Sequence, residues 1–250
     1  MRCSTFAVLS VPLVARAVAG QYENWKFGNM FRLGPAKNAI VKATYTIATP
    51  SVPCGYVQEK PSEEPWLSLW VGLSSSVSDQ KADLFQPLLN WAPNNELQGC
   101  PAPNTQWCVA ASTFSNGQQL AQSYIPIPAE TNVDFELTYD AAKGVTQKVY
   151  MDGKLVSQQT DKTQAGQRPS YLYSSNECYL GTCGTVNGYT WENITVVLEK
   201  ADADFGQTLD LLGASSGAVK TADNGKTWNV DSIKINEDHF YADGSKRKKC

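Results

Sequence analysis

Two neighbouring segments, 65–73 and 84–91, place aromatic and amide side chains in a pattern that suits a binding groove. Each segment alternates apolar and polar residues with a period of two, which is typical of a strand with one buried face. The other face carries the candidate binding residues Trp66, Ser68, Trp70, Gln86 and Asn90. Aromatic surface beside hydrogen-bonding groups is what recognition of an extended polymer requires. We therefore expect a groove for a polypeptide or a polysaccharide on this face.

The opposite face of the first segment predicts part of the hydrophobic core. It consists of Leu67, Leu69, Val71 and Leu73, which we expect to lie between two sheets. A later segment places Tyr171 and Tyr173 on one strand face, and both are further candidates for the groove.

The rest of the chain also indicates strands and no long helix. Short β-rich runs are separated by turn signals, of which Asp152-Gly153 between 149–151 and 154–156 is typical of a tight hairpin. The fold class predicted is all-β, an antiparallel two-sheet β-sandwich. No linker or internal repeat divides the chain into further domains.

The two ends of the chain differ from its body. Residues 1–20 combine Arg2, an apolar run and a small-residue exit, which predicts a signal peptide and a secreted, extracellular protein. The apolar run is too short to span a membrane, and no later stretch qualifies. We therefore expect a sandwich domain over 21–240 and a basic tail over 241–250.

The charge of the chain and its few potential metal ligands limit the partners and cofactors that we expect. The chain has 21 basic and 24 acidic residues, and four of the basic ones lie in 246–249, so the body is acidic and should repel nucleic acid. We expect no nucleic-acid partner, no membrane partner and a monomer. The single histidine and the absence of a CxxC motif argue against a zinc site, and we expect no metal and no cofactor.

Close spacing predicts two disulfides in an oxidising compartment. They join Cys100 to Cys108 and Cys178 to Cys183. Cys54 and Cys250 would then be left over, either joined to each other or free.

The WVGL segment, its polar spacer and LFQPLLNW together resemble the eqolisins, the fungal glutamic peptidases. The resemblance covers about 25 residues closely and implies a concanavalin A-like jelly roll. It also places Gln86 at the position of the catalytic glutamine of that family. In the mechanism that the resemblance implies, a glutamate activates water and the glutamine amide holds the developing oxyanion. Hydrolysis near pH 3–4 would follow.

The chain departs from the family where the glutamate is expected. Alignment on the second cysteine pair places Tyr173 or Ser174 there, and alignment on Trp191 places Ile194 there. The nearest carboxylates are Glu177 and Glu192, so both are candidates for the catalytic glutamate. Strand alternation turns Glu192 toward the side of Ile194 if Asn193 faces solvent. Asn193-Ile194-Thr195 is a sequon, which predicts a glycan on Asn193.

Three functions remain open at this stage. The first is an acid endopeptidase of the glutamic type that acts on extracellular polypeptide. The second is a carbohydrate-binding or carbohydrate-cleaving protein, in which Trp66 and Trp70 stack on sugars and a tyrosine such as Tyr171 or Tyr173 serves a lyase reaction. The third is a surface protein that kept the fold and lost the chemistry.

Overall fold

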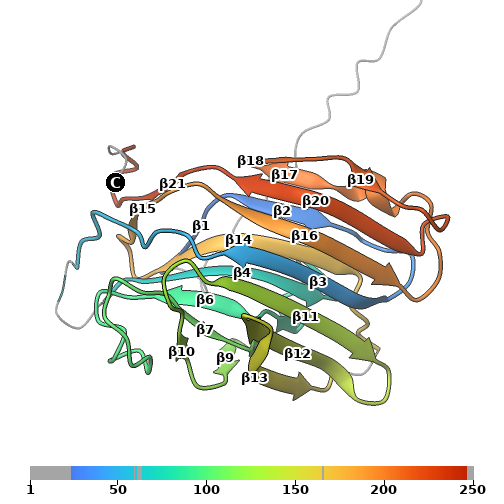
Figure 1. The fold of residues 1–250 in the computed structure, drawn as a ribbon, viewed down its shortest axis with the longest axis horizontal. Helices are drawn as coiled ribbons and strands as arrows, with labels where there is room; N and C mark the ends of the chain where they lie inside the picture. Colours follow the sequence, from blue (N-terminus) through green and yellow to red (C-terminus); the bar gives the residue numbers. More distant parts are fainter. Residues whose placement is uncertain (1–23, 59, 61–63, 165, 247–250) are drawn as a thin grey trace, which may run out of the picture.

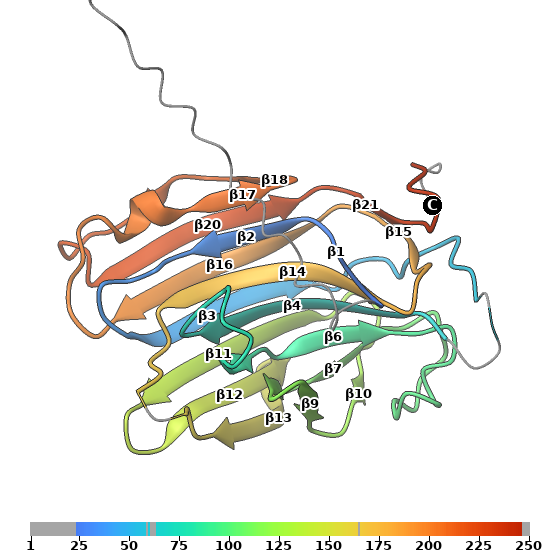
Figure 2. The same cartoon turned by 180° about the vertical axis from the view of Figure 1, so that it is seen from behind.

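The computed structural model describes residues 24–58, 60, 64–164 and 166–246. Two large antiparallel sheets make up almost all of it and stack face to face (Figures 1 and 2). The β-sandwich predicted from the sequence is confirmed. The predicted signal peptide and residues 247–250 of the predicted tail lie outside the described residues. No helix in the described part is long and apolar enough to cross a membrane.

We call the first sheet the site sheet, because it carries the candidate groove residues. Its main path runs in the order β10-β7-β6-β4-β14-β2-β17, and β1, β5, β8 and β9 pair beside this path. The strands are β1 (Trp25–Phe27), β2 (Met30–Leu33), β4 (Trp66–Ser74), β5 (Leu84–Phe85), β6 (Leu88–Trp91), β7 (Cys108–Ala110), β8 (Ser112–Ser115), β9 (Gln118–Ala121), β10 (Ile125–Pro126), β14 (Tyr171–Tyr179) and β17 (Asp210–Leu212).

We call the second sheet the back sheet. Its path runs in the order β13-β12-β11-β3-β16-β20-β18, with β19 paired to β20. The strands are β3 (Ile40–Ala48), β11 (Asn132–Asp140), β12 (Gly144–Met151), β13 (Lys154–Asp161), β16 (Tyr189–Leu198), β18 (Ala214–Ser216), β19 (Val219–Lys220) and β20 (Thr227–Ile235). A small third sheet pairs β15 (Gly184–Val186) with β21 (Asp238–Phe240), and a single 3-10 turn, η1, covers Phe205–Thr208.

The core lies between the two large sheets, as the alternation in β4 predicts. Leu67, Leu69, Val71 and Leu73 are all fully buried. Across the core, the hydroxyl of Tyr45 on β3 donates to the Val71 carbonyl at 2.7 Å, so a hydrogen bond joins the two sheets in the middle of the core. The hairpin predicted at Asp152-Gly153 joins β12 to β13, and both turn residues have positive φ, as a tight hairpin requires.

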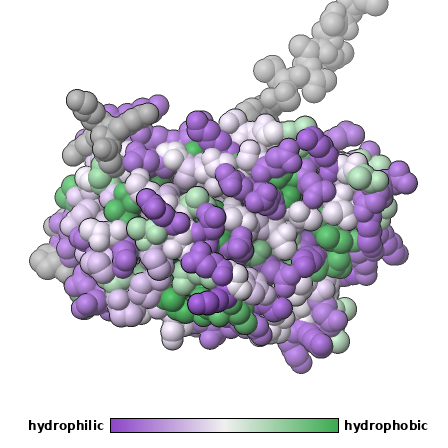
Figure 3. Space-filling view, viewed as in Figure 1, coloured by the Kyte–Doolittle hydropathy of each residue, from purple (hydrophilic) through white to green (hydrophobic). Residues whose placement is uncertain are grey.

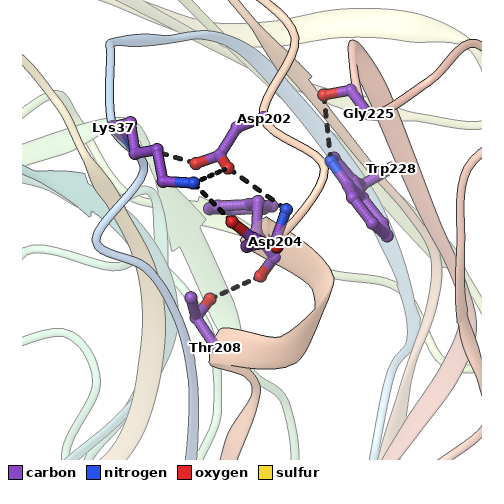
Figure 4. A network of polar contacts seen from close by, with 7 residues as sticks. Lys37, Asp202, Asp204, Thr208, Gly225 and Trp228 are labelled. Atoms are coloured by element: carbon purple, nitrogen blue, oxygen red, sulfur yellow. Dashed lines mark hydrogen bonds and ion pairs between the residues drawn. The ribbon is translucent and has the colours of Figure 1, made fainter.

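A cluster of polar contacts fixes η1 to the loop between β2 and β3 (Figure 4). The buried carboxylate of Asp202 accepts from the Lys37 backbone N–H and ammonium, each at 3.1 Å. The same ammonium contacts Asp204 at 2.5 Å. Burial would raise the pKa of Asp202, but the Lys37 and Asp204 donors outweigh it, and its pKa lies below the ordinary value. This cluster has a structural role and lies outside the groove.

Candidate functional site

The candidate site lies on the outer face of the site sheet, where β14, β4 and β6 run side by side. The register aligns Glu177, Ser68 and Asn90 in one row across these strands. The next row holds Ser175, Trp70 and Leu88. We call these two rows the carboxyl row and the indole row. The sequence-predicted residues Ser68, Trp70 and Asn90 are therefore neighbours in the structure.

Glu177 is the carboxylate that β14 contributes to this face. Its side chain is half-buried, and its Oε2 accepts from the Trp70 indole N–H at 2.7 Å. Burial raises the pKa of Glu177 to about 7, although the Trp70 hydrogen bond acts in the opposite direction. A carboxyl group with such a pKa exchanges protons near neutrality, which is a property of catalytic acids and bases.

The amide of Asn90 lies at the other end of the carboxyl row. Asn90 is buried, and its Oδ1 accepts from Ser68 Oγ at 2.5 Å. Two strand spacings separate its Cα from that of Glu177, about 10 Å. Ser68 is the small residue between them, and it is buried as well.

Gln86 lies further along the same face. The pairing of Leu73 with Phe85 and of Trp70 with Leu88 places it opposite Gly72. A Cβ on Gly72 would lie only 3.0 Å from the Gln86 Cβ and 2.6 Å from Leu84 Cδ1. The glycine therefore lets the segment that carries Gln86 approach β4 closely. The register therefore puts Gln86 on the face predicted for it.

The register does not bring Gln86 and Glu177 together. Their rows are four residues apart along β4, and the two residues lie on opposite sides of it, about 13 Å along the strand and about 10 Å across it. Gln86 is also buried, and its Nε2 donates to Gln119 Oε1 at 3.1 Å. The residue of β14 that lies directly across Gly72 is Tyr173, which is not an acid.

Glu192 lies on the outer face of the back sheet, so the core separates it from Gln86. The inward orientation expected of it is wrong, because both Glu192 and Asn193 are exposed. Asn193 has a φ of +53°, and the register of β16 against β3 shifts at this point. This β-bulge lets Trp191 and Ile194 both enter the core despite their odd spacing.

The surface of the molecule that faces the viewer in Figure 1 is mainly hydrophilic, as the space-filling view in the same orientation shows (Figure 3).

The aromatic residues of the face divide into buried and accessible ones. Trp70 is only 3% exposed and packs edge-on against Tyr173, so the prediction that its ring stacks on a sugar is wrong. Trp66, Tyr171 and Tyr173 are half-buried and keep some accessible surface.

A hollow of about 380 Å³ adjoins the carboxyl row at the start of β4. Its lining includes Trp66, Tyr179, Leu97 and the side chains of Gln58, Glu64, Asn94 and Gln98. Sequence reasoning missed this hollow, because its wall comes from the irregular segment 92–107 and from the loop before β4. It also missed Phe27, which pairs with Glu177 and is 54% exposed. The alternation in Trp25-Lys26-Phe27 was a signal for that residue.

Both predicted disulfides are present. Cys100 and Cys108 have Cα atoms 6.3 Å apart, and those of Cys178 and Cys183 are 5.9 Å apart. Cys54 is disulfide-bonded as well, while Cys250 lies outside the described residues. Cys178 follows Glu177 directly, so one disulfide anchors the strand end that carries the carboxylate. No group of three or more potential metal ligands occurs in the described part of the chain.

Comparisons with known proteins support the fold. No protein-family model and no curated protein sequence matches the chain. Among solved structures, scytalido-glutamic peptidase with a transition-state-analogue inhibitor has a TM-score of 0.51 at 11% identity, covering 82% of this chain and 97% of that one. SCP-B, an eqolisin bound to the tripeptide Ala-Ile-His, has a TM-score of 0.46 at 12% identity, covering 83% and 97%. Bacillus licheniformis β-glucanase has a TM-score of 0.35 at 11% identity, covering 86% and 82%.

The expected resemblance to the eqolisins is therefore found in the structure as well as in the WVGL and LFQPLLNW segments. At 11% identity it shows that the chain shares the eqolisin sandwich. The chemistry has to be argued from the residues of this chain.

Proposed function

We propose that this protein is an extracellular hydrolase that cleaves polypeptide, with Glu177 as its general acid and base. The observation that carries the proposal is the half-buried Glu177 carboxyl, whose pKa burial raises to about 7, in one row with Ser68 and Asn90. The two disulfides suit an oxidising, extracellular compartment.

The proposed chemistry uses both protonation states of Glu177. The ionised carboxylate takes a proton from a water molecule above Ser68, and the water oxygen attacks the carbonyl carbon of the peptide bond. The resulting carboxyl group then gives this proton to the leaving nitrogen as the C–N bond breaks. Glycoside hydrolysis normally uses two carboxylates. Strands β14, β4 and β6 carry one carboxylate, that of Glu177. A single carboxylate favours an amide substrate over a glycoside.

The working pH follows from the pKa of Glu177. A glutamate of ordinary pKa keeps a useful ionised fraction near pH 4. With a pKa of about 7, only about one molecule in a thousand is ionised at pH 4. Activity that depends on the ionised form should therefore rise toward neutral pH, and the optimum near pH 3–4 expected from the family resemblance moves upward.

The test is hydrolysis of a denatured protein between pH 4 and pH 8. Glu177→Gln should lose activity by about 100-fold or more, since it removes the proton acceptor. Two matched controls are Glu192→Gln, on the back sheet, and Gln86→Leu, which is distant from Glu177. Both should stay near the wild-type rate. Absence of hydrolysis by the wild type at every pH, or full activity in Glu177→Gln, would overturn the proposal.

The hollow beside Trp66 favours a second function, carbohydrate binding. Two aromatic side chains, Trp66 and Tyr179, line it together with the amides of Gln58, Asn94 and Gln98, and this combination suits a sugar ring and its hydroxyls. In this alternative Trp66→Ala abolishes binding to a soluble polysaccharide, whereas Glu177→Gln keeps it. Failure of the wild type to bind any polysaccharide of a plant, fungal and bacterial panel would remove this alternative.

A further inference from the structure

The hollow beside Trp66 contains one charged side chain, that of Glu64. Its other lining residues are aromatic, aliphatic or amide residues, and no basic residue lines it in the described part of the chain. Gln98 Nε2 donates to Glu64 Oε2 at 3.4 Å, which is long for a hydrogen bond. No described lysine, arginine or histidine forms an ion pair with Glu64. The wall of the hollow therefore carries a negative charge that no neighbouring cation neutralises.

The position of Glu64 restricts the ligands that the hollow can take. The residue is half-buried, and a ligand that fills the hollow would remove more of the water around the carboxylate. Loss of that water is costly unless a hydrogen-bonding partner or an opposite charge replaces it. A neutral sugar offers hydroxyl donors alone, whereas an ammonium group offers a positive charge and three N–H donors. The hollow therefore favours a cationic ligand.

Two aromatic rings belong to the same wall. Trp66 on β4 and Tyr179 on β14 are paired in the sheet, and both line the hollow. The ring of Trp66 packs edge-on against Tyr124, with centroids 6.3 Å apart. The ring of Tyr179 packs against Trp25, with centroids 4.4 Å apart. Held in this way, the two rings offer surface both to the apolar face of a sugar ring and to a cation.

Disulfides hold the loops that complete the lining. Leu180 lies inside the loop that Cys178 and Cys183 close. The segment 94–98 supplies three lining residues and ends two residues before the disulfide-bonded Cys100. A lining that is ordered before the ligand arrives loses little conformational entropy on binding. The hollow therefore has the properties of a preformed ligand site.

The size and the amides of the hollow favour a sugar over an amino-acid side chain. Its volume of about 380 Å³ lies in the range of pockets that hold a whole small molecule. The amides of Gln58, Asn94 and Gln98 supply donors as well as acceptors. Sugar hydroxyls can use both, whereas the end of a lysine side chain has no acceptor. A ring, hydroxyls and an ammonium group occur together in an amino sugar.

We propose that the hollow binds an amino sugar with a free ammonium group, as one unit of a cationic polysaccharide. Glu64 is the partner of the ammonium group, and Trp66 and Tyr179 are the surface for the ring. The inference rests on the second function proposed above, carbohydrate binding, and names its ligand class. It is independent of hydrolysis by Glu177.

Three β-1,4-linked tetramers that differ only at carbon 2 test the proposal. They consist of glucosamine, N-acetylglucosamine or glucose, which carry an ammonium, an acetamide or a hydroxyl group at that carbon. Calorimetry at pH 5.5, where the amine is protonated, should show that the wild type binds the glucosamine tetramer about tenfold or more tightly than the other two. The reason is that only this tetramer forms a charge-assisted hydrogen bond. Glu64→Gln should bring the ratio toward one and keep the affinity for the neutral tetramers, which also shows that the variant has folded.

Two further variants and a second cation serve as controls. Glu96 is exposed on the same loop as Asn94 but does not line the hollow, so Glu96→Gln removes the same charge and should keep the wild-type ratio. Trp66→Ala should weaken binding of the glucosamine tetramer as well, because the ring supports the sugar frame. Tetralysine, which has the charges without the sugar rings, should bind about tenfold or more weakly than the glucosamine tetramer.

The outcomes separate the inference from the function on which it rests. If the wild type binds all three tetramers equally, or if Glu64→Gln keeps the full ratio, carbohydrate binding stands and the ammonium assignment is wrong. If Glu96→Gln lowers the ratio as much as Glu64→Gln does, the preference belongs to the acidic surface in general and the inference fails. Tetralysine that binds as tightly as the glucosamine tetramer would assign the hollow to basic polypeptide instead. If the wild type binds no tetramer, carbohydrate binding fails and the inference fails with it.

Discussion

The indole N–H of Trp70 donates to Glu177 Oε2 at 2.7 Å, and this contact crosses from β4 to β14 between adjacent rows of one sheet face. It uses the donor of a buried tryptophan to orient a half-buried carboxyl. The hydrogen bond favours the ionised form, whereas burial favours the neutral form, and burial has the larger effect. The balance leaves the pKa of Glu177 at about 7.

Removing the indole donor should therefore raise the pKa of Glu177 further. In Trp70→Phe the carboxylate loses its hydrogen bond, and we expect the pKa of Glu177 to rise above its wild-type value by about one unit. Titration of carboxyl-labelled glutamate by NMR measures it. Trp66→Phe is the matched control, since it removes the neighbouring indole without touching the bond to Glu177. A pKa that is unchanged or lower in Trp70→Phe would contradict this account of the contact.

The same raised pKa predicts how stability depends on pH. In the unfolded chain Glu177 ionises near pH 4.5, and in the folded protein near pH 7. Between these values only the unfolded state releases the proton, so the free energy of unfolding falls as pH rises through this window. Glu177→Gln removes this loss. We expect it to match the wild type at pH 4 and to be about 1–3 kcal/mol more stable at pH 8.

Urea unfolding at the two pH values checks this prediction. The comparison between pH 4 and pH 8 cancels any packing change that the glutamine causes, because only the charged form is penalised. Glu192→Gln, at an exposed site, should show no such difference between the two pH values. The difference in unfolding free energy between Glu177→Gln and the wild type could also be the same at pH 4 and at pH 8. That result would show that burial of the ionised Glu177 carries no cost.

The fold could be predicted from local patterns. Alternation identifies the buried face of β4 because each side of a strand repeats every second residue, and Asp152-Gly153 marks a hairpin because both positions need positive φ. The site could be predicted only in part. The same alternation fails at Glu192, where Asn193 adds a bulge and reverses the parity of the strand. A bulge depends on the partner strand, which the sequence does not reveal.

The partners of the groove residues also depend on register between distant strands. The segment 84–91 predicts that Gln86 and Asn90 share a face, but it does not show which of them lies in the row of Glu177. The pairing of β4 with β6 and with β14 decides in favour of Asn90.

Asp202 should contribute stability that is lost in acid. Its pKa is lowered in the folded protein, so the contribution is present above the unfolded pKa near 3.8 and disappears as pH falls through the lower folded value. Asp202→Asn should cost about 1–3 kcal/mol at pH 7 and less at pH 2. Asp204→Asn, whose side chain is 66% exposed, is the control and should cost little. Equal losses at pH 7 and pH 2 would contradict the ionic part of this role.

The two disulfides should differ in what their loss changes. The disulfide between Cys100 and Cys108 closes a short loop, so by chain entropy replacing both cysteines with alanine should cost about 2–3 kcal/mol. Because this pair is far from Glu177 along the chain, the same variant should leave the pKa of Glu177 at its wild-type value. Replacing Cys178 and Cys183 should instead change the pKa of Glu177, which precedes Cys178. Urea unfolding of each variant and NMR titration of Glu177 separate the two disulfides, and an equal change in the pKa of Glu177 in both variants would contradict this account.

Asn193 should have two roles that can be separated by substitution. It is exposed within its sequon, so we expect a glycan there when a eukaryotic host makes the protein. It also holds the positive φ of the bulge in β16, a conformation that costs most side chains about 1–2 kcal/mol and that asparagine and glycine tolerate. Asn193→Gly should lose the glycan but keep the unfolding free energy of the deglycosylated protein. Asn193→Gln should lose the glycan and about 1 kcal/mol as well. Mass spectrometry before and after glycosidase treatment measures the first effect, and urea unfolding of the deglycosylated proteins measures the second. A wild-type mass that glycosidase leaves unchanged would refute the glycan, and equal stability of the two variants would refute the backbone role.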